Sequence, residues 1–114
     1  MTRDDRELLE LAAKAAGIAY IKPAEGYDGS LGLAAGSHPM QTHPWNPLAD
    51  DGDALRLAVK LRMGISLPIH KTIKADVVVF TDSSVNVREE GDDPYAATRR
   101  AIVRAAAEIG RNMK

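Results

Sequence analysis

The valine-rich run at residues 75–80, Ala-Asp-Val-Val-Val-Phe, constrains the fold of this chain more than any other feature. Three consecutive β-branched residues favour a β-strand, because their side chains pack well on a pleated surface. The run is apolar on both of its faces, which is typical of a strand in the centre of a sheet. The rest of the chain must therefore supply neighbouring strands and helices that cover them.

Three shorter segments are candidates for the neighbouring strands. Residues 65–70 alternate apolar and other side chains, and Pro68 cannot donate to a ladder, so we expect this strand at an edge or a bulge. Residues 85–88 alternate cleanly, and the short polar link before them predicts an antiparallel hairpin with the valine-rich run. Residues 18–22 are the remaining candidate strand, and we expect Pro23 to end it.

Three segments have apolar residues at helical spacing: residues 4–16, 51–62 and 94–112. Gly17 fits the left-handed position that commonly follows a helix, and it is expected to end the first one. Gly64 is expected to play the same part after the second helix. The sequence therefore predicts three helices with defined ends.

The same spacing predicts which faces of the helices are buried. In the second helix, Leu55, Ala58 and Val59 form the apolar stripe, and Leu61 widens it. In the last helix, six alanines between residues 96 and 107 permit a close approach to the sheet or to a neighbouring helix. The predicted inner face of that helix consists of Ala97, Ala101, Ile102, Ala105, Ile109 and Met113.

Together these elements predict an α+β fold in a single domain of 114 residues, a length that suffices for one hydrophobic core. Three helices are expected to pack on a small, mostly antiparallel sheet of about four strands, layered as an α/β/α sandwich. Residues 23–44 contain many glycines and prolines and show no clear period, so they are predicted to form a long loop. Loops of this length often carry function on a rigid scaffold.

Three aspartates are predicted to act as structural caps. Asp50 precedes the second helix, and its carboxylate can accept from the free N–H groups of the first turn. Asp53, three residues later, resembles the return partner of a capping box, although Glu or Gln is usual there. Asp93 comes directly before Pro94, and a capping aspartate followed by a proline at the first helical position is a strong helix start.

The acidic stretch Asp50, Asp51 and Asp53 could instead hold a divalent cation. Carboxylate oxygens on a short turn suit Mg²⁺ or Ca²⁺. The spacing is not that of an EF-hand loop, however, and no glutamate follows at the position that would close one. We therefore expect capping rather than metal binding at these residues, and no cofactor.

The chain contains three histidines, His38, His43 and His70. The first two lie close together in the predicted loop, and the third is far along the chain. Metal sites normally need three or four protein ligands. We therefore expect exposed loop histidines rather than a metal site.

Arg99, Arg100 and Arg104 on the last helix could form an anion site. Arg100 and Arg104 are one turn apart, so their guanidinium groups can share a face and clamp a phosphate or a carboxylate. Together with Tyr27 in the loop and Trp45 at its end, they would bound a pocket for a small anionic or aromatic ligand. In the alternative interpretation, which we favour, the arginines form a solvated face or pair internally, with the acidic stretch described above as their possible partners.

Composition excludes several classes of function. The chain has no cysteine, so disulfides, thiolate metal sites and thiol catalysis are excluded. A net charge of −1 and an aromatic content of 4% argue against nucleic acid or an anionic membrane as the partner. No apolar run has transmembrane length, and residues 1–7 lack the composition of a signal peptide. We therefore expect a cytoplasmic protein.

Residues 45–61, WNPLADDGDALRLAVKL, and residues 93–108, DPYAATRRAIVRAAAE, resemble the phage ABA sandwich domain family of small phage and prophage proteins. The two blocks occur in order and cover about a third of the chain. The resemblance implies an α/β/α layered domain of phage origin, working in the cytoplasm of a bacterial host. It implies no activity and no functional residue, since the family has no established activity to carry over.

The function expected from these observations is that of a small phage or prophage accessory protein, a non-enzymatic binding module for a small anionic ligand or a host protein. The first alternative is a metal-dependent hydrolase or nucleotide-acting enzyme that uses the acidic stretch. Against it, the chain has no Gly-rich phosphate loop, no nucleophile elbow and no His-Glu-x-x-His motif. The second alternative is a structural or assembly role, which an exposed apolar patch would favour. Self-association into a homo-oligomer is left open.

Overall fold

The computed structural model describes residues 3–18, 20–21, 31–35, 38–67, 75–82 and 84–113. Its helices are α1 (Arg3–Ala16), α2 (Asp51–Lys60) and α3 (Pro94–Asn112). Its strands are β1 (Tyr20–Ile21), β2 (Leu31–Ala35), β3 (His38–Trp45), β4 (Gly64–Ser66), β5 (Ala75–Phe80) and β6 (Asn86–Gly91). The α+β class and the three helices predicted from the sequence are therefore confirmed.

The described strands form two antiparallel sheets of three strands, in the orders β1-β2-β3 and β4-β5-β6. The valine-rich strand β5 lies in the centre of its sheet, β4 before Pro68 lies at an edge, and β5 and β6 form the predicted hairpin. The prediction of one sheet of about four strands is not confirmed. β1 lies within the strand predicted at residues 18–22, but it pairs with β2 and so belongs to the other sheet.

The prediction of a loop at residues 23–44 is wrong where β2 and β3 lie. Each strand pairs antiparallel, with Leu33 of β2 opposite His43 of β3, and the register shifts between Ala34 and Ala35. The sequence hides both strands, because β2 contains glycine and alanine instead of β-branched residues, and β3 contains two prolines. The prolines are tolerated because β3 is an edge strand of its sheet.

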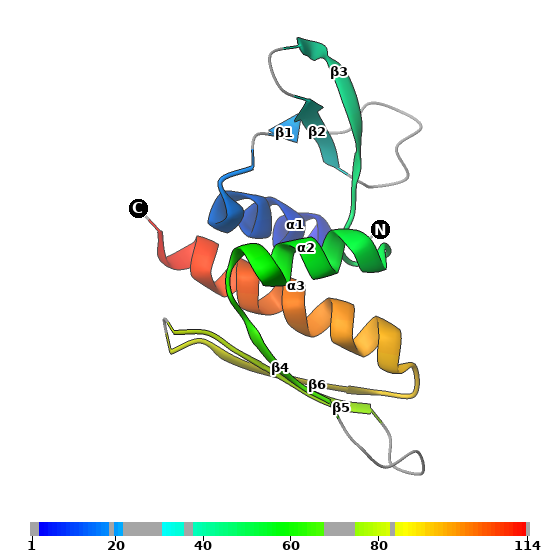
Figure 1. Cartoon of the computed structure of the whole chain (residues 1–114), viewed down its shortest axis with the longest axis vertical. Coiled ribbons are helices and arrows are strands. Elements are labelled where there is room, and N and C mark those ends of the chain that lie inside the picture. The colour runs from blue at the N-terminus through cyan, green and yellow to red at the C-terminus, as the bar shows by residue number, and fades with distance from the viewer. Residues whose placement is uncertain are drawn as a thin grey trace.

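Helix α3 lies at the centre of the described fold, between the sheet β4-β5-β6 on one side and helices α1 and α2 on the other (Figure 1). Only one face of that sheet is covered by described helices. Val77 and Val79 on β5 point to α3 and are fully buried, whereas Val78 is partly exposed and Phe80 is 49% exposed. The described elements therefore stack as helices on one face of the sheet, and the expected α/β/α layering is not seen among them.

Small residues allow α3 to be buried on several sides at once. Its buried positions are Ala97, Ala101, Ile102, Val103, Ala105, Ala106, Ala107 and Gly110. The close approach predicted from its alanines is confirmed, and it involves both the sheet and α1. Two positions of the predicted inner face differ: Ile109 is only partly buried, and Met113 is exposed because it follows the end of the helix.

Two of the helices end in Schellman motifs, in which two backbone N–H groups turn back to the last carbonyls. After α1, Gly17 has the predicted left-handed conformation, with φ of 68°. After α2, the left-handed residue is Arg62, with φ of 54°, and the N–H of Met63 donates to the carbonyl of Ala58 at 2.9 Å. The prediction that Gly64 ends this helix is therefore wrong, since Gly64 is the first residue of β4.

Candidate functional site

The loop before α2 is tied to the helix start by Asp50. Its backbone is extended, and its carboxylate accepts a hydrogen bond from the N–H of Asp53 at 2.8 Å. Asp93 plays the same part for α3, where it accepts from the N–H groups of Tyr95 and Ala96 in front of a helix that begins with Pro94. Both predicted N-caps are confirmed.

Asp53 does not complete a capping box, because its carboxylate does not reach the N–H of Asp50. One oxygen accepts from the N–H of Asn46 at 3.0 Å, and the other accepts from the guanidinium of Arg56 at 2.8 Å. The N–H of Asp50 donates instead to the carbonyl of Asn46. Asp53 is therefore a structural residue, as predicted, but it anchors the preceding loop rather than the N-cap.

Arg99 joins α3 to the same loop. Its Nε donates to the carbonyl of Leu48 at 2.9 Å, and its Nη1 pairs with the carboxylate of Asp51 at 2.7 Å. The Arg99 side chain is only 19% exposed, whereas that of Asp51 is 70% exposed. The predicted internal pairing between the acidic stretch and the arginines of α3 is confirmed for this pair.

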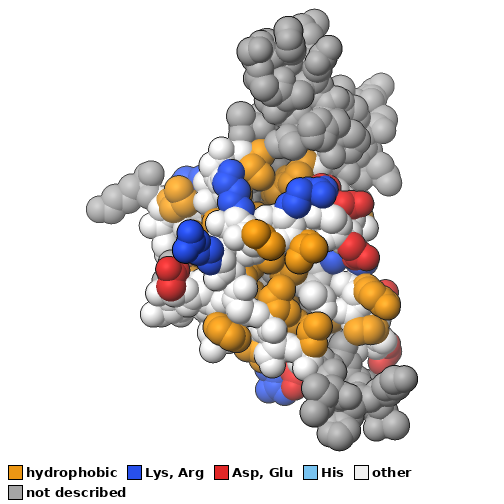
Figure 2. Space-filling view, viewed as in Figure 1, with side chains coloured by type: hydrophobic (Ala, Val, Ile, Leu, Met, Phe, Trp, Pro, Cys, Tyr) orange, Lys and Arg blue, Asp and Glu red, His pale blue; other side chains and the backbone are white. Residues whose placement is uncertain are grey.

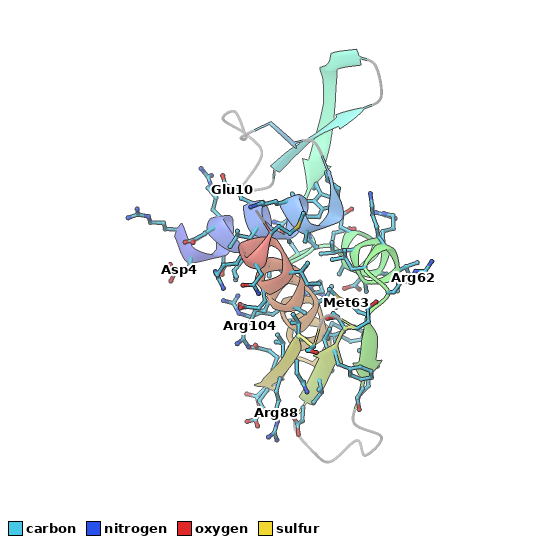
Figure 3. The ribbon with its side chains drawn as sticks, turned by 90° about the vertical axis from the view of Figure 1, so that its left-hand side faces the viewer. Asp4, Glu10, Arg62, Met63, Arg88 and Arg104 are labelled. Carbon is cyan, nitrogen blue, oxygen red and sulfur yellow. The ribbon has the colours of Figure 1, made fainter. Side chains whose placement is uncertain are left out.

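Arg100 and Arg104 pair with other carboxylates than those predicted. Arg100 lies 3.1 Å from the carboxylate of Asp5 on α1, and Arg104 pairs with Glu89 on β6 and donates to the carbonyl of Arg88. Figure 3 shows Arg104 on the side of α3 that faces β6. The three arginines of the predicted anion site, including the predicted clamp of Arg100 and Arg104, are thus each engaged by a carboxylate within the described part of the chain.

The carboxylates of Asp50, Asp51 and Asp53 are each engaged: Asp50 accepts from the N–H of Asp53, Asp51 pairs with Arg99, and Asp53 accepts from the N–H of Asn46 and from Arg56, which also lies 3.9 Å from Asp50. Among the described residues, no group of three or more His, Asp or Glu side chains could hold a metal ion. The geometry of the acidic stretch therefore matches capping and anchoring.

Of the remaining predicted site residues, Trp45 has a described side chain. Trp45 is 4% exposed and packs in the hydrophobic core, so its ring is not available at the surface. Tyr27 and His70 lie outside the described residues, and for His38 and His43 only the backbone within β3 is described.

A feature of the described surface that the sequence did not predict is an apolar groove between α2 and β4, with α3 as its floor. Its volume is about 490 Å³. Figure 2 shows hydrophobic side chains gathered on this face of the molecule. The lining residues are Asp51, Ala54, Leu55, Ile65, Leu67, Pro94, Tyr95, Thr98, Arg99 and Ile102.

Large apolar side chains stand exposed around this groove. Leu55 on α2 is 61% exposed, Leu67 after β4 is 55% exposed, and Tyr95 at the start of α3 is 69% exposed. Val59, one turn after Leu55 on α2, is also exposed. Single exposed apolar residues are ordinary on protein surfaces, but a contiguous group around a hollow marks an interaction site.

The apolar stripe predicted for α2 is confirmed for Ala58, which is buried, and for Leu61, which is partly buried against the core, but it is wrong for Leu55 and Val59. The core-facing residues are Ala54, Leu57 and Ala58, whereas Leu55 and Val59 point to solvent. The sequence contained an indication that α2 has an exposed apolar face. Its apolar residues, at positions 54, 55, 57, 58, 59 and 61, cover too wide an arc for a helix with one buried face. On β4, Ile65 pairs with Val79 and so lies on the same, helix-facing side of the sheet.

An ion pair occupies the face of the sheet β4-β5-β6 that none of the described helices covers. The guanidinium of Arg88 donates to both carboxylate oxygens of Asp76, at 2.6 and 2.8 Å. These hydrogen bonds lower the pKa of Asp76 below its ordinary value, and the charge of Arg88 acts in the same direction. Figure 3 shows Arg88 pointing away from the helices. The pair lies on a different side of the sheet from the groove.

Comparison with known proteins gives no relative: the chain matches no protein-family profile, no curated protein and no solved structure. The phage family suggested by the sequence blocks therefore remains a prediction. None of the helices in the described part of the chain is long and apolar enough to cross a membrane.

Proposed function

We propose that this chain is a non-enzymatic binding protein whose partner is another polypeptide, and that the groove between α2 and β4 is the site of contact. The observation that carries the proposal is the group of exposed apolar side chains around the groove: Leu55, Leu67 and Tyr95. Each would lose contact with water if a partner covered it, which is the dominant favourable contribution to association. An exposed apolar patch also favours the assembly role considered from the sequence.

A polypeptide suits the groove better than a small anion does. Arg99 is the basic residue among those that line the groove, and its Nη1 and Nε are already engaged by Asp51 and by the carbonyl of Leu48. An anionic ligand would have to displace Asp51 from that pair. The exposed rim residues, in contrast, extend the apolar surface beyond the hollow itself, as the contact surface of a protein partner requires.

The rival hypothesis of an enzyme that uses Asp50, Asp51 and Asp53 has a direct test. Calorimetric titration with Mg²⁺, Ca²⁺, Mn²⁺ and Zn²⁺ should give no site-specific binding tighter than about the millimolar range, the weak end for oxygen-ligand sites. Our reason is that each of the three carboxylates is already engaged by a backbone N–H group or by an arginine. A one-to-one isotherm that Asp51→Asn abolishes would favour the enzyme and count against our proposal.

The wider setting is part of the same proposal. A phage or prophage origin and a role in the bacterial cytoplasm are supported by the two sequence blocks that resemble phage proteins, and by a chain without cysteine. A role in phage assembly and a role in binding a host protein would each use an exposed apolar surface of the kind that α2 and β4 present.

The experiment is a comparison of tagged wild-type protein with two surface variants in affinity purification from a bacterial lysate that expresses it. Leu55→Gln removes an apolar side chain of the groove, and Met113→Gln removes a similarly exposed one far from it. We expect the wild-type and Met113→Gln proteins to retain the same polypeptides in equal amounts, and untagged copies of this chain can be among them. The Leu55→Gln protein should lose these polypeptides. Retention that is the same for all three proteins would contradict the proposal.

A further inference from the structure

We infer that the polypeptide segment that covers the groove is an amphipathic helix, and that a lysine or an arginine beside its apolar face pairs with Asp51. The inference rests on the proposed function, because it states the chemistry of the partner at the same groove. Two observations carry it. The polar side chains in the groove are few and largely engaged, and the end of the groove where α2 and α3 begin is acidic.

The groove offers few hydrogen-bond partners to the backbone of another polypeptide. Most of the residues that line it are apolar. The hydroxyl of Thr98 donates to the carbonyl of Pro94 at 2.7 Å. The guanidinium of Arg99 is held by the carbonyl of Leu48 and the carboxylate of Asp51. A backbone N–H or carbonyl group that is buried without a partner is unfavourable. A helix bonds these groups internally, so its apolar face can cover the groove while its backbone stays satisfied.

The shape of the groove suits the side chains of one helix face. Leu55 on α2 and Leu67 after β4 are exposed lining residues from different elements, and Tyr95 stands at the start of α3. A volume of about 490 Å³ lies within the range that accommodates a small ligand, so the hollow can take several side chains. Apolar side chains three and four residues apart along a helix form a stripe of this kind.

Carboxylates gather at the end of the groove where α2 and α3 begin. Asp51 is the first residue of α2 and Pro94 the first of α3, and both line the groove. The caps Asp50 and Asp93 come directly before them, and Asp92 precedes Asp93. The side chains of Asp50 and Asp51 are 60% and 70% exposed. Figure 2 shows acidic side chains beside hydrophobic ones at the right of this face.

The positive groups at this end do not neutralise the carboxylates. There are five of the latter: Asp50, Asp51, Asp53, Asp92 and Asp93. Against them stand two arginines, Arg56 and Arg99, and the starts of two helices, each equivalent to about half a positive charge. This end of the groove therefore keeps a negative charge.

Asp51 is the carboxylate that a partner meets at the groove. In its pair with Arg99, the arginine is only 19% exposed, whereas Asp51 is 70% exposed. A helix that covered the groove would take water away from this carboxylate, which is unfavourable unless a cation replaces the water. A lysine or an arginine on the helix supplies that cation, and an acidic residue in the same place would be repelled.

The experiment selects binding peptides from a displayed library of random linear peptides, with the full-length wild-type protein as bait. We expect the enriched peptides to carry apolar residues three and four positions apart, with a lysine or an arginine beside that stripe. Leu55→Gln should weaken the binding of such a peptide about tenfold or more. Met113→Gln, which changes a similarly exposed residue beyond the end of α3, should bind as wild type does. Circular dichroism of each variant verifies the fold.

The helix and the ion pair each have a separate test on an enriched peptide. A proline in the middle of the peptide should abolish binding, because it breaks a helix. Asp51→Asn in the protein, and glutamine for the basic residue of the peptide, should each weaken binding about two- to fivefold, the range that one exposed ion pair contributes. The two changes together should weaken it no more than either alone. Glu108→Gln is the matched control, because Glu108 also pairs with an arginine of α3, Arg111, near the other end of that helix.

The inference is overturned if no peptide is enriched, or if the enriched peptides lack helical spacing or place an acidic residue beside the stripe. Binding that does not depend on Leu55, or effects of the two charge changes that simply add, would also overturn it. If the peptide selection fails but the lysate still yields a polypeptide that is retained through Leu55, such as a second copy of this chain, the proposed function stands and the inference falls. If neither retention nor peptide binding depends on Leu55, both fall.

Discussion

Gly110 on α3 lies directly against the backbone carbonyl of Leu11 on α1. A methyl group on Gly110 would overlap the oxygen and the carbon of that carbonyl. Around the contact, Ala12, Ala13 and Ala16 of α1 are also buried. The two helices therefore approach at a distance that only very small side chains permit, and α1 forms the outer cover of α3.

The first prediction follows from this contact. Gly110→Ala should destabilise the protein by about 1–3 kcal/mol, because the extra methyl group must push two helix backbones apart. Helix propensity alone predicts the opposite sign, a stabilisation of about 1 kcal/mol. Urea denaturation of wild type and variant distinguishes the two.

A matched control for that variant is Gly64→Ala. There the added methyl group would meet the ring of Phe80, the residue paired with Gly64 across β4 and β5. That ring is 49% exposed and can rotate away, whereas the carbonyl of Leu11 cannot. We expect a smaller loss at Gly64, and an equal or larger one would show that α1 and α3 are less tightly packed than described.

The second prediction concerns the start of α2. Asp50→Ala should lower the free energy of unfolding by about 0.5–2 kcal/mol, and Asp50→Ser by much less, because serine can also accept from the N–H of residue 53. The hydrogen bond at stake is 2.8 Å long. Equal losses for both variants in a denaturant titration would instead show that the charge of Asp50, and not the cap, is what matters.

The third prediction ranks the two neighbouring aspartates. Asp53→Ala should cost about 1–3 kcal/mol, because it leaves the N–H of Asn46 without its acceptor in a partly buried site. Asp51→Ala should cost only about 0.2–1 kcal/mol, since it breaks an ion pair whose acidic side chain is largely exposed. Thermal unfolding of the two variants side by side gives the order, and a reversed order would remove the anchoring role from Asp53.

The fourth prediction is a pH dependence from the pair of Asp76 and Arg88. The hydrogen bonds from Arg88 lower the pKa of Asp76 in the folded protein below its ordinary 3.8. The stability that this pair contributes is therefore complete above the unfolded pKa and is lost as the pH falls through the folded one. Asp76→Asn should accordingly unfold with a weaker dependence on pH below about 4 than wild type does.

The carboxyl resonance of Asp76 provides the direct measurement for that pair. In an NMR titration, Arg88→Gln should move the pKa of Asp76 back up towards its ordinary value. Glu90→Gln serves as the comparison, because Glu90 contacts the same guanidinium at 3.2 Å and lies opposite Asp76 across β5 and β6, but it supplies none of the hydrogen bonds that lower the pKa of Asp76. An Asp76 pKa that does not respond to Arg88→Gln would contradict the geometry of the pair.

The sequence predicted correctly those strands, caps and helix ends that depend on residues close together in the chain. The valines of β5, the hairpin to β6, the caps Asp50 and Asp93, and Gly17 after α1 were all identified correctly. Each depends on the conformational preference of a few consecutive residues, or on a hydrogen bond to a neighbour two or three positions away. The edge position predicted for the strand at residues 65–70 is confirmed for β4, although Pro68, on which that prediction rested, lies outside the described residues.

Relations between distant residues were decided only by the tertiary structure. Whether Leu55 or Leu57 faces the core depends on where α3 lies, because α2 has enough apolar residues for two faces. β2 and β3 are held by backbone pairing with each other, and their side chains do not show the alternation of apolar and polar residues that predicts a strand. Arg100 pairs with Asp5 on α1, and Arg104 pairs with Glu89 on β6. Both partners lie on other elements, so the spacing of residues along α3 could not identify them. The groove has the same origin: its walls come from α2, β4 and α3, and no single stretch of sequence contains it.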